Sequence, residues 1–534
     1  MGELRDRGTG VLMHISSLPG KYGVGDLGSS AREFAGMLSG AGVSAWQMLP
    51  LVPTSGAFAH SPYSSPSAFA GNIMYISPDK LAEEGLIDAS ELVEHVAPDS
   101  TSADFARAYD IKRAILKACY KNFRDGEAYR TTFRDMSDKF WDFCFEEAYW
   151  LEDYALYSVL KDMEGGMEWS GWRRDFRVRN WDALDPLKAK PEIASALDER
   201  RFEQFLFFRQ LGELRDVCKE LGVSLIGDLP IYVAYDSADV WGHQDLFDLD
   251  DEGRPISVAG VPPDYFSATG QRWGNPIYRW DRMRRDGYFW WLGRCRHALR
   301  QADRVRIDHF RGLLAFWDIP VSEPTAENGY WKAGPGSDLL SAMKHCFADG
   351  ASGTMPFIAE DLGVRTDDVI QAMEDFGMPG MKVLQFAFGQ GMSENPYIPH
   401  NHRRNCVVYS GTHDNDTSAG WWSASATEEE RENFKKYMDL KNMDEREAAD
   451  AMVRCALSST ADLAVITVQD ILRLGAGARM NTPSTVEGNW VWKLENLADL
   501  KKEMARVGEL SSLFGRSALK GDRQSGGRPA GNLF

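Results

Sequence analysis

The stretch FEQFLFFRQLGELRDVCKELGVSLIGDLPIYV (202–233) joins a helical pattern directly to a strand-like segment. Apolar residues in 202–222 recur at the spacing of an amphipathic helix, whereas 224–233 contains a short apolar run. Seven more strand-like segments occur along the chain, and helical patterns separate many of them. Eight strands alternating with helices predict an α/β fold, a closed parallel (β/α)8 TIM barrel rather than an open sheet. The predicted strands are 9–16, 44–51, 224–233, 303–310, 355–361, 381–388, 405–411 and 463–470.

The length of the chain predicts large insertions, because 534 residues far exceed the roughly 250 of a plain barrel. We expect the barrel to occupy 1–515, interrupted by a helical subdomain at 79–200 and a loop-rich insertion at 234–300, with the insertions on its C-terminal face. The polar, glycine-rich stretch 516–534 is predicted to be a disordered tail. Too few residues follow the last strand for a C-terminal β-sandwich domain.

Composition and charge exclude several classes of partner. The formal net charge of −19 disfavours nucleic acid and anionic lipid. No apolar run of membrane-spanning length occurs, and MGELRDRGTG (1–10) has no signal-like segment. Seven cysteines stand singly with no CxxC pair, which favours reduced thiols over disulfides or a zinc site. We therefore predict a cytoplasmic protein with no nucleic-acid or membrane partner, and leave its oligomeric state open.

Two short motifs suggest bound cofactors or metals. GVGDLG (23–28) fits the GxGxxG pattern of dinucleotide sites, but it lies several residues beyond the predicted strand, and no acid ends the next strand. DLDDEG (248–253) resembles the start of a calcium loop, but the twelfth position is Ala259 instead of Glu, so a hairpin turn is favoured. We predict neither a cofactor nor a metal. An NAD-dependent oxidoreductase remains an alternative that only GVGDLG supports.

Acidic residues follow the carboxyl ends of several predicted strands, where barrel active sites lie. One such acid often only caps the next helix, but acids after the third, fourth, fifth and seventh strands would converge on one pocket. Glycosidic bond cleavage requires such a set, since one carboxylate attacks or stabilises the sugar carbon and a protonated one donates to the leaving oxygen. The candidate acids are Asp228, Asp308, Glu360, Asp414, Asp416 and Asp470.

Two of these acids are predicted to have different roles in catalysis. Arg306 lies two positions before Asp308 on the same strand and would keep that carboxylate ionised. Without the other acids, a structural salt bridge would explain the pair equally well. Glu360 would need a raised pKa to act as an acid, which neighbouring anions would supply. A retaining enzyme requires the two carboxyl groups about 5–5.5 Å apart.

The motifs together resemble the amylomaltase (4-alpha-glucanotransferase, disproportionating enzyme) family of alpha-amylase-like retaining enzymes. The resemblance covers nearly all of 9–500, and the long DYFSATGQRWGNP loop with SPY and RMNTP makes it specific. The motifs that carry it are WQMLPL (46–51), SPYSSPSAFAGN (61–72), GDLPIYV (227–233), AGVPPDYFSATGQRWGNP (259–276), RIDHFRG (306–312), IAEDLG (358–363), GTHDNDT (411–417) and RMNTPSTVEGNWVW (479–492).

The resemblance implies transfer of alpha-1,4-glucan segments between maltooligosaccharides, which serve as donor and acceptor, with release of glucose. It implies that Asp308 is the nucleophile, Glu360 the general acid/base and Asp414 a third carboxylate that holds sugar hydroxyls. A hydrolase of the same architecture and a non-catalytic glycan-binding protein remain alternatives, and the second would show a broken acid set. The residues implied to bind substrate or orient the nucleophile are Tyr63, Asp228, Asp264, Tyr265, Phe266, Gln271, Trp273, Arg306, His413 and Asn481.

Overall fold

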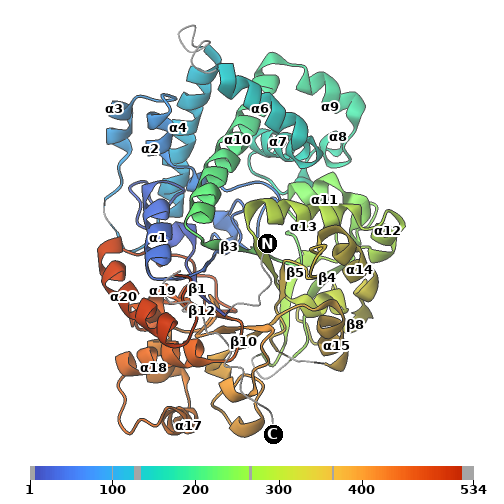
Figure 1. Cartoon of the computed structure of the whole chain (residues 1–534). Helices are drawn as coiled ribbons and strands as arrows, with labels where there is room; N and C mark the ends of the chain where they lie inside the picture. The colour runs from blue at the N-terminus through green and yellow to red at the C-terminus, as the bar shows by residue number, and fades with distance from the viewer. Residues whose placement is uncertain (1–6, 99, 126–133, 264–266, 364–365, 520–534) are drawn as a thin grey trace.

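The computed structural model describes residues 7–98, 100–125, 134–263, 267–363 and 366–519. Eight parallel strands close into a barrel in the order β1-β12-β11-β10-β9-β6-β3-β2 (Figure 1). Each strand predicted from sequence contributes one member of this barrel, so the (β/α)8 prediction is confirmed. The strands are β1 Gly8–Leu12, β2 Ala45–Gln47, β3 Ser224–Leu229, β6 Arg304–Ile307, β9 Phe357–Ala359, β10 Gly380–Val383, β11 Cys406–Tyr409 and β12 Leu463–Thr467.

The barrel strands are apolar because parallel strands in such folds are covered on both faces. All five residues of β12 (LAVIT) are buried, as are all five of β1. The observed strands end earlier than the predicted segments. The residues just past the ladder, Asp308 after β6 and Glu360 after β9, therefore stand at the mouth of the barrel.

Helices cover the outside of the barrel between most pairs of strands (Figure 1). β10 and β11 differ, since three short 3-10 turns within 384–401 connect them. No helix in the described part of the chain is both long and apolar enough to cross a membrane. The main outer helices are α1 Ser29–Gly40, α10 Pro191–Glu220, α13 Phe289–Gln301, α14 Gly336–Phe347, α15 Asp367–Phe376, α17 Glu428–Met438, α18 Glu445–Ser458 and α20 Leu497–Leu513.

The segment between β2 and β3 forms a helical layer above the barrel, drawn in blue, blue-green and green in the upper part of Figure 1. Its core is aromatic: Phe202 of α10 stacks on Phe123 at 4.6 Å between ring centroids and meets Phe140 edge-on at 5.9 Å. α10 then returns the chain to the barrel. The other helices here are α2 Pro78–Glu83, α3 Ala89–Leu92, α4 Phe105–Asp125, α6 Arg134–Glu146, α7 Ala148–Met163, α8 Arg174–Arg177 and α9 Trp181–Lys188.

A second, antiparallel sheet with the order β5-β4-β7-β8 lies beside the barrel. The sequence interpretation missed it, because it described 234–300 as loop-rich and predicted no strand in 311–335. The reason is local: β5 reads QRWGNP, whose Gly, Asn and Pro favour turns, and all but one residue of β8 are exposed. The strands are β4 Ser257–Val261, β5 Gln271–Pro276, β7 Ala315–Pro320 and β8 Tyr330–Ala333.

The DLDDEG segment forms the predicted hairpin turn. Asp250 accepts hydrogen bonds through one carboxylate oxygen from the backbone N–H groups of Glu252 and Arg254, at 2.9 and 2.8 Å. Leu249 and Pro255 pair as an antiparallel bridge on either side. The acidic side chain therefore serves the turn itself, and the hairpin interpretation is confirmed.

The first residues of the tail predicted at 516–534 pack against the barrel, and 520–534 lie outside the described residues. Arg516 is 1% exposed and donates hydrogen bonds of 2.6–2.9 Å to the carbonyl oxygens of Leu457, Gly8, Ser459 and Ala461. These carbonyls belong to β1, to the last turn of α18 and to the turn before β12. The polar, glycine-rich composition of this segment did not predict the contact. A single guanidinium can donate to four carbonyl oxygens, and this needs no apolar residues that a sequence pattern would reveal.

We expect Arg516→Ala to destabilise the fold by at least about 3 kcal/mol, since it leaves several buried carbonyl oxygens unsatisfied. Chemical denaturation measures the change in the free energy of unfolding. Lys501→Ala, at an exposed position of α20, is the matched control and should change stability by less than about 0.5 kcal/mol. Equal stability of the two variants would show that the Arg516 contacts do not help to hold the first and last strands of the barrel together.

Candidate active site

Asp308 and Glu360 stand side by side at the carboxyl end of the barrel. β6 and β9 are neighbours in which Ile307 pairs with Ala359, and the two acids are the next residues on each strand. The backbone N–H of Glu360 donates to the Ile307 carbonyl at 3.0 Å, and that of Asp308 donates to the Leu229 carbonyl of β3 at 3.0 Å. The ladder itself therefore brings these two carboxyl groups into one place.

Arg306 links the nucleophile candidate to a buried acid. Its guanidinium is 2.8 Å from an oxygen of Asp308 and donates to both oxygens of Asp228 at 2.8 and 2.9 Å. The Asp228 side chain has no exposed surface, whereas that of Asp308 is 28% exposed. Burial opposes the charge on Arg306, but the two carboxylates outweigh it and raise its pKa well above the ordinary value. The guanidinium is thus always charged and faces Asp308.

Glu360 is held by two backbone groups. Its carboxylate oxygens accept hydrogen bonds from the N–H of His309 at 2.8 Å and from the N–H of Leu362 at 2.7 Å. His309 has a left-handed backbone with φ 51°, which is uncommon for a residue other than glycine. The residue after Asp308 thus gives its backbone N–H to Glu360, so one backbone step serves both acids.

The environment of Glu360 favours its protonated form. Burial raises the pKa of this carboxyl to about 7, and the negative charge of Asp308 adds to the shift. The Arg306 charge and the two backbone hydrogen bonds act in the opposite direction without reversing it. Glu360 can therefore give up a proton near neutral pH, which is what an acid/base group requires.

Asp414 lies in the loop after β11 and is kept ionised. Burial alone would raise the pKa of its carboxyl, but His413 at 3.1 Å and a 2.6 Å hydrogen bond from Asn481 lower that pKa well below the ordinary value. The Asp414 side chain is 44% exposed, so it remains available to a ligand. Arg479 braces this corner by donating to the backbone carbonyls of Asp414 and Asn481 at 2.6 and 2.7 Å.

Aromatic rings flank the acids on two sides. Tyr63 stacks on His413 with ring centroids 5.0 Å apart, and its hydroxyl donates to Asp228 at 2.6 Å. Trp273 of β5 meets His309 edge-on at 4.9 Å and is 38% exposed, and its indole N–H donates to Gln271 at 3.1 Å. Asp264, Tyr265 and Phe266, which the sequence assigned to the same loop, lie outside the described residues.

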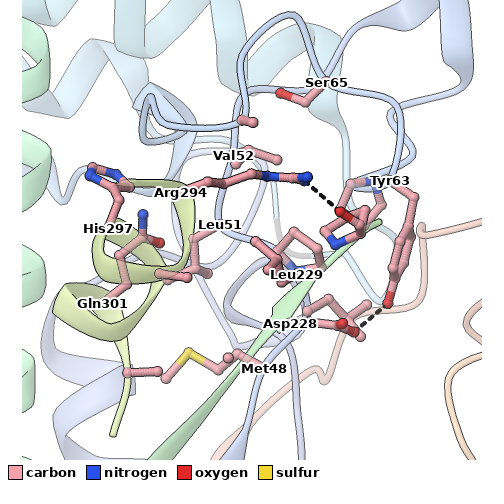
Figure 2. A pocket seen from close by; sticks show the side chains of 18 of the residues that line it. Met48, Leu51, Val52, Tyr63, Ser65, Asp228, Leu229, Arg294, His297 and Gln301 are labelled. Atoms are coloured by element: carbon pink, nitrogen blue, oxygen red, sulfur yellow. Dashed lines mark hydrogen bonds between the residues drawn. The ribbon is translucent and has the colours of Figure 1, made fainter. Parts of the chain in front are cut away.

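A small cavity of about 50 Å³ lies behind Tyr63 and Asp228. Figure 2 shows the Tyr63 hydroxyl pointing to the Asp228 carboxylate, with Arg294 reaching across from α13. Arg294 donates to the carbonyls of Pro230 and Ile231 just past β3. This volume holds only a few water molecules, so the cavity is part of the support behind Asp228 rather than a place for a sugar.

The loop that carries Tyr63 is clamped to the helical insertion. Gln204 of α10 both accepts from the N–H of Gly71 at 2.7 Å and donates to its carbonyl at 3.1 Å. A Cβ at Gly71 would lie 1.9 Å from the Phe207 ring, so only glycine permits this approach. Asp239 holds the same loop from the other side by accepting from the N–H of Ala68 at 2.7 Å.

The acid set, the arginine between two carboxylates and the flanking rings come from separate segments between Tyr63 and Trp490. The model of the 4-alpha-glucanotransferase family matches residues 13–499, a range that contains every candidate site residue. The chain belongs to this family.

Individual 4-alpha-glucanotransferases align over almost their whole length. The enzyme of Thermus thermophilus is 45% identical over 493 residues, which cover 91% of this chain and 95% of the relative. That of Aquifex aeolicus is 41% identical, with 95% and 99% covered. The solved structure of amylomaltase from Streptococcus agalactiae in complex with acarbose has a TM-score of 0.88 at 34% identity, covering 96% of this chain and 100% of that one.

Ten of the site residues predicted from sequence are described by the structure, and seven of them form one chain of direct contacts: Tyr63, Asp228, Arg306, Asp308, His413, Asp414 and Asn481. Glu360 and Trp273 both contact His309, and Gln271 accepts the hydrogen bond of the Trp273 indole. The structure also adds residues that sequence reasoning missed: His309 by its backbone, Arg479 beneath Asp414, and Trp490, whose ring lies 5.9 Å from those of Tyr63 and His413. RIDHF and RMNTPSTVEGNW contain all three, but no pattern reveals a left-handed φ.

Proposed function

We propose that Asp308 is the nucleophile and Glu360 the acid/base of a retaining 4-alpha-glucanotransferase. The observation that carries this assignment is the contrast between the neighbouring acids. Asp308 faces the Arg306 guanidinium at 2.8 Å, which favours an anionic nucleophile, whereas burial raises the pKa of Glu360 to about 7, which favours a proton donor. Two neighbouring carboxyl groups in different protonation states are what double displacement at a sugar carbon needs.

In the first step, a carboxylate oxygen of Asp308 attacks the anomeric carbon and the bond from that carbon to the glycosidic oxygen breaks. Glu360 gives its proton to the departing oxygen, which leaves as the 4-hydroxyl of the shortened glucan. In the second step, Glu360 takes the proton from the 4-hydroxyl of an acceptor glucan, whose oxygen attacks the same carbon and releases the Asp308 carboxylate. The configuration at that carbon is retained, and no water is consumed.

The surrounding groups have supporting roles in this proposal. Asp414, ionised and half-exposed, accepts hydrogen bonds from sugar hydroxyls, and His413 and Asn481 hold it in place. Tyr63 offers a ring face to the sugar. Asp228 is a positioning residue, because its carboxylate is buried and binds Arg306 and Tyr63.

Incubation with maltotriose alone tests the function. Transfer produces glucose together with maltopentaose and longer chains, whereas a hydrolase produces glucose and maltose with nothing longer than the substrate. Chromatography of the products over time separates the two. Chains that never exceed three units would overturn transferase activity and leave the hydrolase alternative.

Transfer competes with hydrolysis only when water is kept from the glucosyl–Asp308 intermediate. We expect Trp273→Ala to raise the ratio of hydrolysis to transfer severalfold, because Trp273 contacts His309 beside the nucleophile and leaves over a third of its surface open to a sugar. The measurement is reducing ends formed per glucosyl unit transferred from maltotriose. Trp331→Ala, on edge strand β8 at 42% exposure, is the control. An unchanged ratio in the Trp273 variant would rule out its part in excluding water.

We also propose that the chain works in the cytoplasm. All seven cysteines are free and six are buried, which suits a reducing compartment. Burial raises the pKa of several of these thiols, including Cys295 and Cys455, to about 12, so they remain unreactive.

A further inference from the structure

A second, larger pocket opens on the helical side of the molecule. It has a volume of about 450 Å³ and is formed by α7, α13, the short helix α11 Ala238–Gly242 and α12 Trp280–Arg285. None of Asp308, Glu360 and Asp414 lines it. Its volume falls within the range of roughly 300–1,000 Å³ that small-molecule sites occupy, so it is large enough for a ligand of its own.

Two aromatic rings at the rim of this pocket are exposed to solvent. Phe289 is 71% exposed at the start of α13, and Tyr149 is 46% exposed on α7. Trp290 and Phe69, deeper in the wall, are almost wholly buried. Exposed rings at the edge of a hollow are typical of binding sites for flat apolar faces.

The charges around the pocket disfavour an anionic ligand. Its lining includes five carboxylates and three arginines. Arg282 already pairs with Asp245 and Asp286 at 3.1 and 3.0 Å, and Arg300 pairs with Glu146 at 3.7 Å. A phosphate group would have to compete with these acids, whereas the hydroxyl groups of a neutral ligand can donate to carboxylates and accept from guanidinium groups at the same time.

A stripe of exposed rings continues outward from the pocket. Trp141 and Phe145 lie four residues apart on α6, at 51% and 86% exposure, and Tyr149 follows at the start of α7, at 46% exposure. Residues four apart lie on one face of a helix, so Trp141 and Phe145 share a face of α6. The rise of about 6 Å between them gives two successive platforms for a long, repeating ligand.

We propose that this pocket binds a second stretch of alpha-1,4-glucan, with Phe289 and Tyr149 stacking on its sugar rings and the stripe Trp141, Phe145 and Tyr149 supporting the chain outside. The inference rests on the proposed function, because it takes the substrate class from it. The loop 61–72 connects the two places: Tyr63 stands among the catalytic acids, and Ser67 and Phe69 line this pocket. A long glucan bound here is therefore kept near the cleft, whereas a trisaccharide gains nothing.

Kinetics with long and short substrates test this. We expect Phe289→Ala to raise the KM for amylose about fivefold to tenfold and to leave kcat/KM for maltotriose unchanged. Trp181→Ala removes another exposed ring, 45% exposed, that does not line the pocket, and should change neither. An unchanged KM for amylose, or an equal loss with maltotriose, would overturn the proposal. A wild-type protein that extends no chain would instead overturn the proposed function.

Binding measurements count the sites directly. Calorimetric titration of the full-length Asp308→Asn protein with maltoheptaose should show two classes of site, and adding Phe289→Ala should remove one. A single site that the Phe289 change does not affect would refute the second glucan site. A second copy of this chain is the other possible occupant of an aromatic surface, and sedimentation tests it. If the wild-type chain self-associates, and if Phe289→Ala abolishes that association without changing glucan binding, the surface is a contact between two copies.

Discussion

Asp308→Asn is expected to lower the rate of maltotriose disproportionation by about 10^4-fold or more, in line with other replacements of covalent nucleophiles. An amide oxygen neither attacks the anomeric carbon effectively nor offers the negative charge that stabilises the developing cation. Asp308 is the only acid of the set that both faces Arg306 and keeps an open side chain. Asp228 is not placed to replace it, because that carboxylate is fully buried on the other side of the same guanidinium.

The fold of this variant should remain intact. Arg306 keeps both hydrogen bonds to Asp228, and the backbone N–H of residue 308 still donates to the Leu229 carbonyl of β3. Thermal unfolding and circular dichroism of the purified variant verify this. Near-normal disproportionation by a folded Asp308→Asn protein would refute the nucleophile assignment.

Glu360→Gln is expected to lower the same rate by about 10^2–10^4-fold, the usual contribution of a general acid/base. Glutamine accepts the backbone hydrogen bond of His309 or Leu362 through one oxygen only and has no acidic proton. A donor whose leaving group needs no proton, alpha-maltosyl fluoride, distinguishes this role from a structural one. The variant should release a stoichiometric burst of fluoride as Asp308 becomes glycosylated, and absence of the burst would contradict the acid/base assignment.

The pH dependence follows from the same carboxyl. Because burial raises the pKa of Glu360 to about 7, the protonated fraction and the rate of the first step should fall as the pH rises through that value, and Glu360→Gln should lose this alkaline limb. Stability changes in the same range. The folded pKa exceeds the unfolded value of about 4.5, so the contribution of this carboxyl to stability falls as the pH rises from 4.5 to 7, and the wild-type protein should lose more stability over that range than the glutamine variant.

The barrel could be predicted from sequence because its signal is local and repeated. Each strand is a short apolar run next to a helical pattern, and eight such units leave few other topologies. The second sheet could not, since β5 and β8 have turn-forming or exposed residues and are strands only through pairing with β4 and β7. The contact of Arg516 with four carbonyls could not be predicted either, because it also depends on distant parts of the chain. Its partners are about 55 to 508 residues away.

For the site, the sequence alone determined which acids end the strands and which family motifs surround them. Only the tertiary structure decided how those acids differ. The pKa of Glu360 depends on burial and on Asp308, a neighbour from another strand, and the arginine between Asp228 and Asp308 acts across two strands. The left-handed turn at His309 joins both acids through one backbone N–H. The sequence states which residue occupies each position. The charge state and orientation of that residue depend on groups that meet only when the barrel closes.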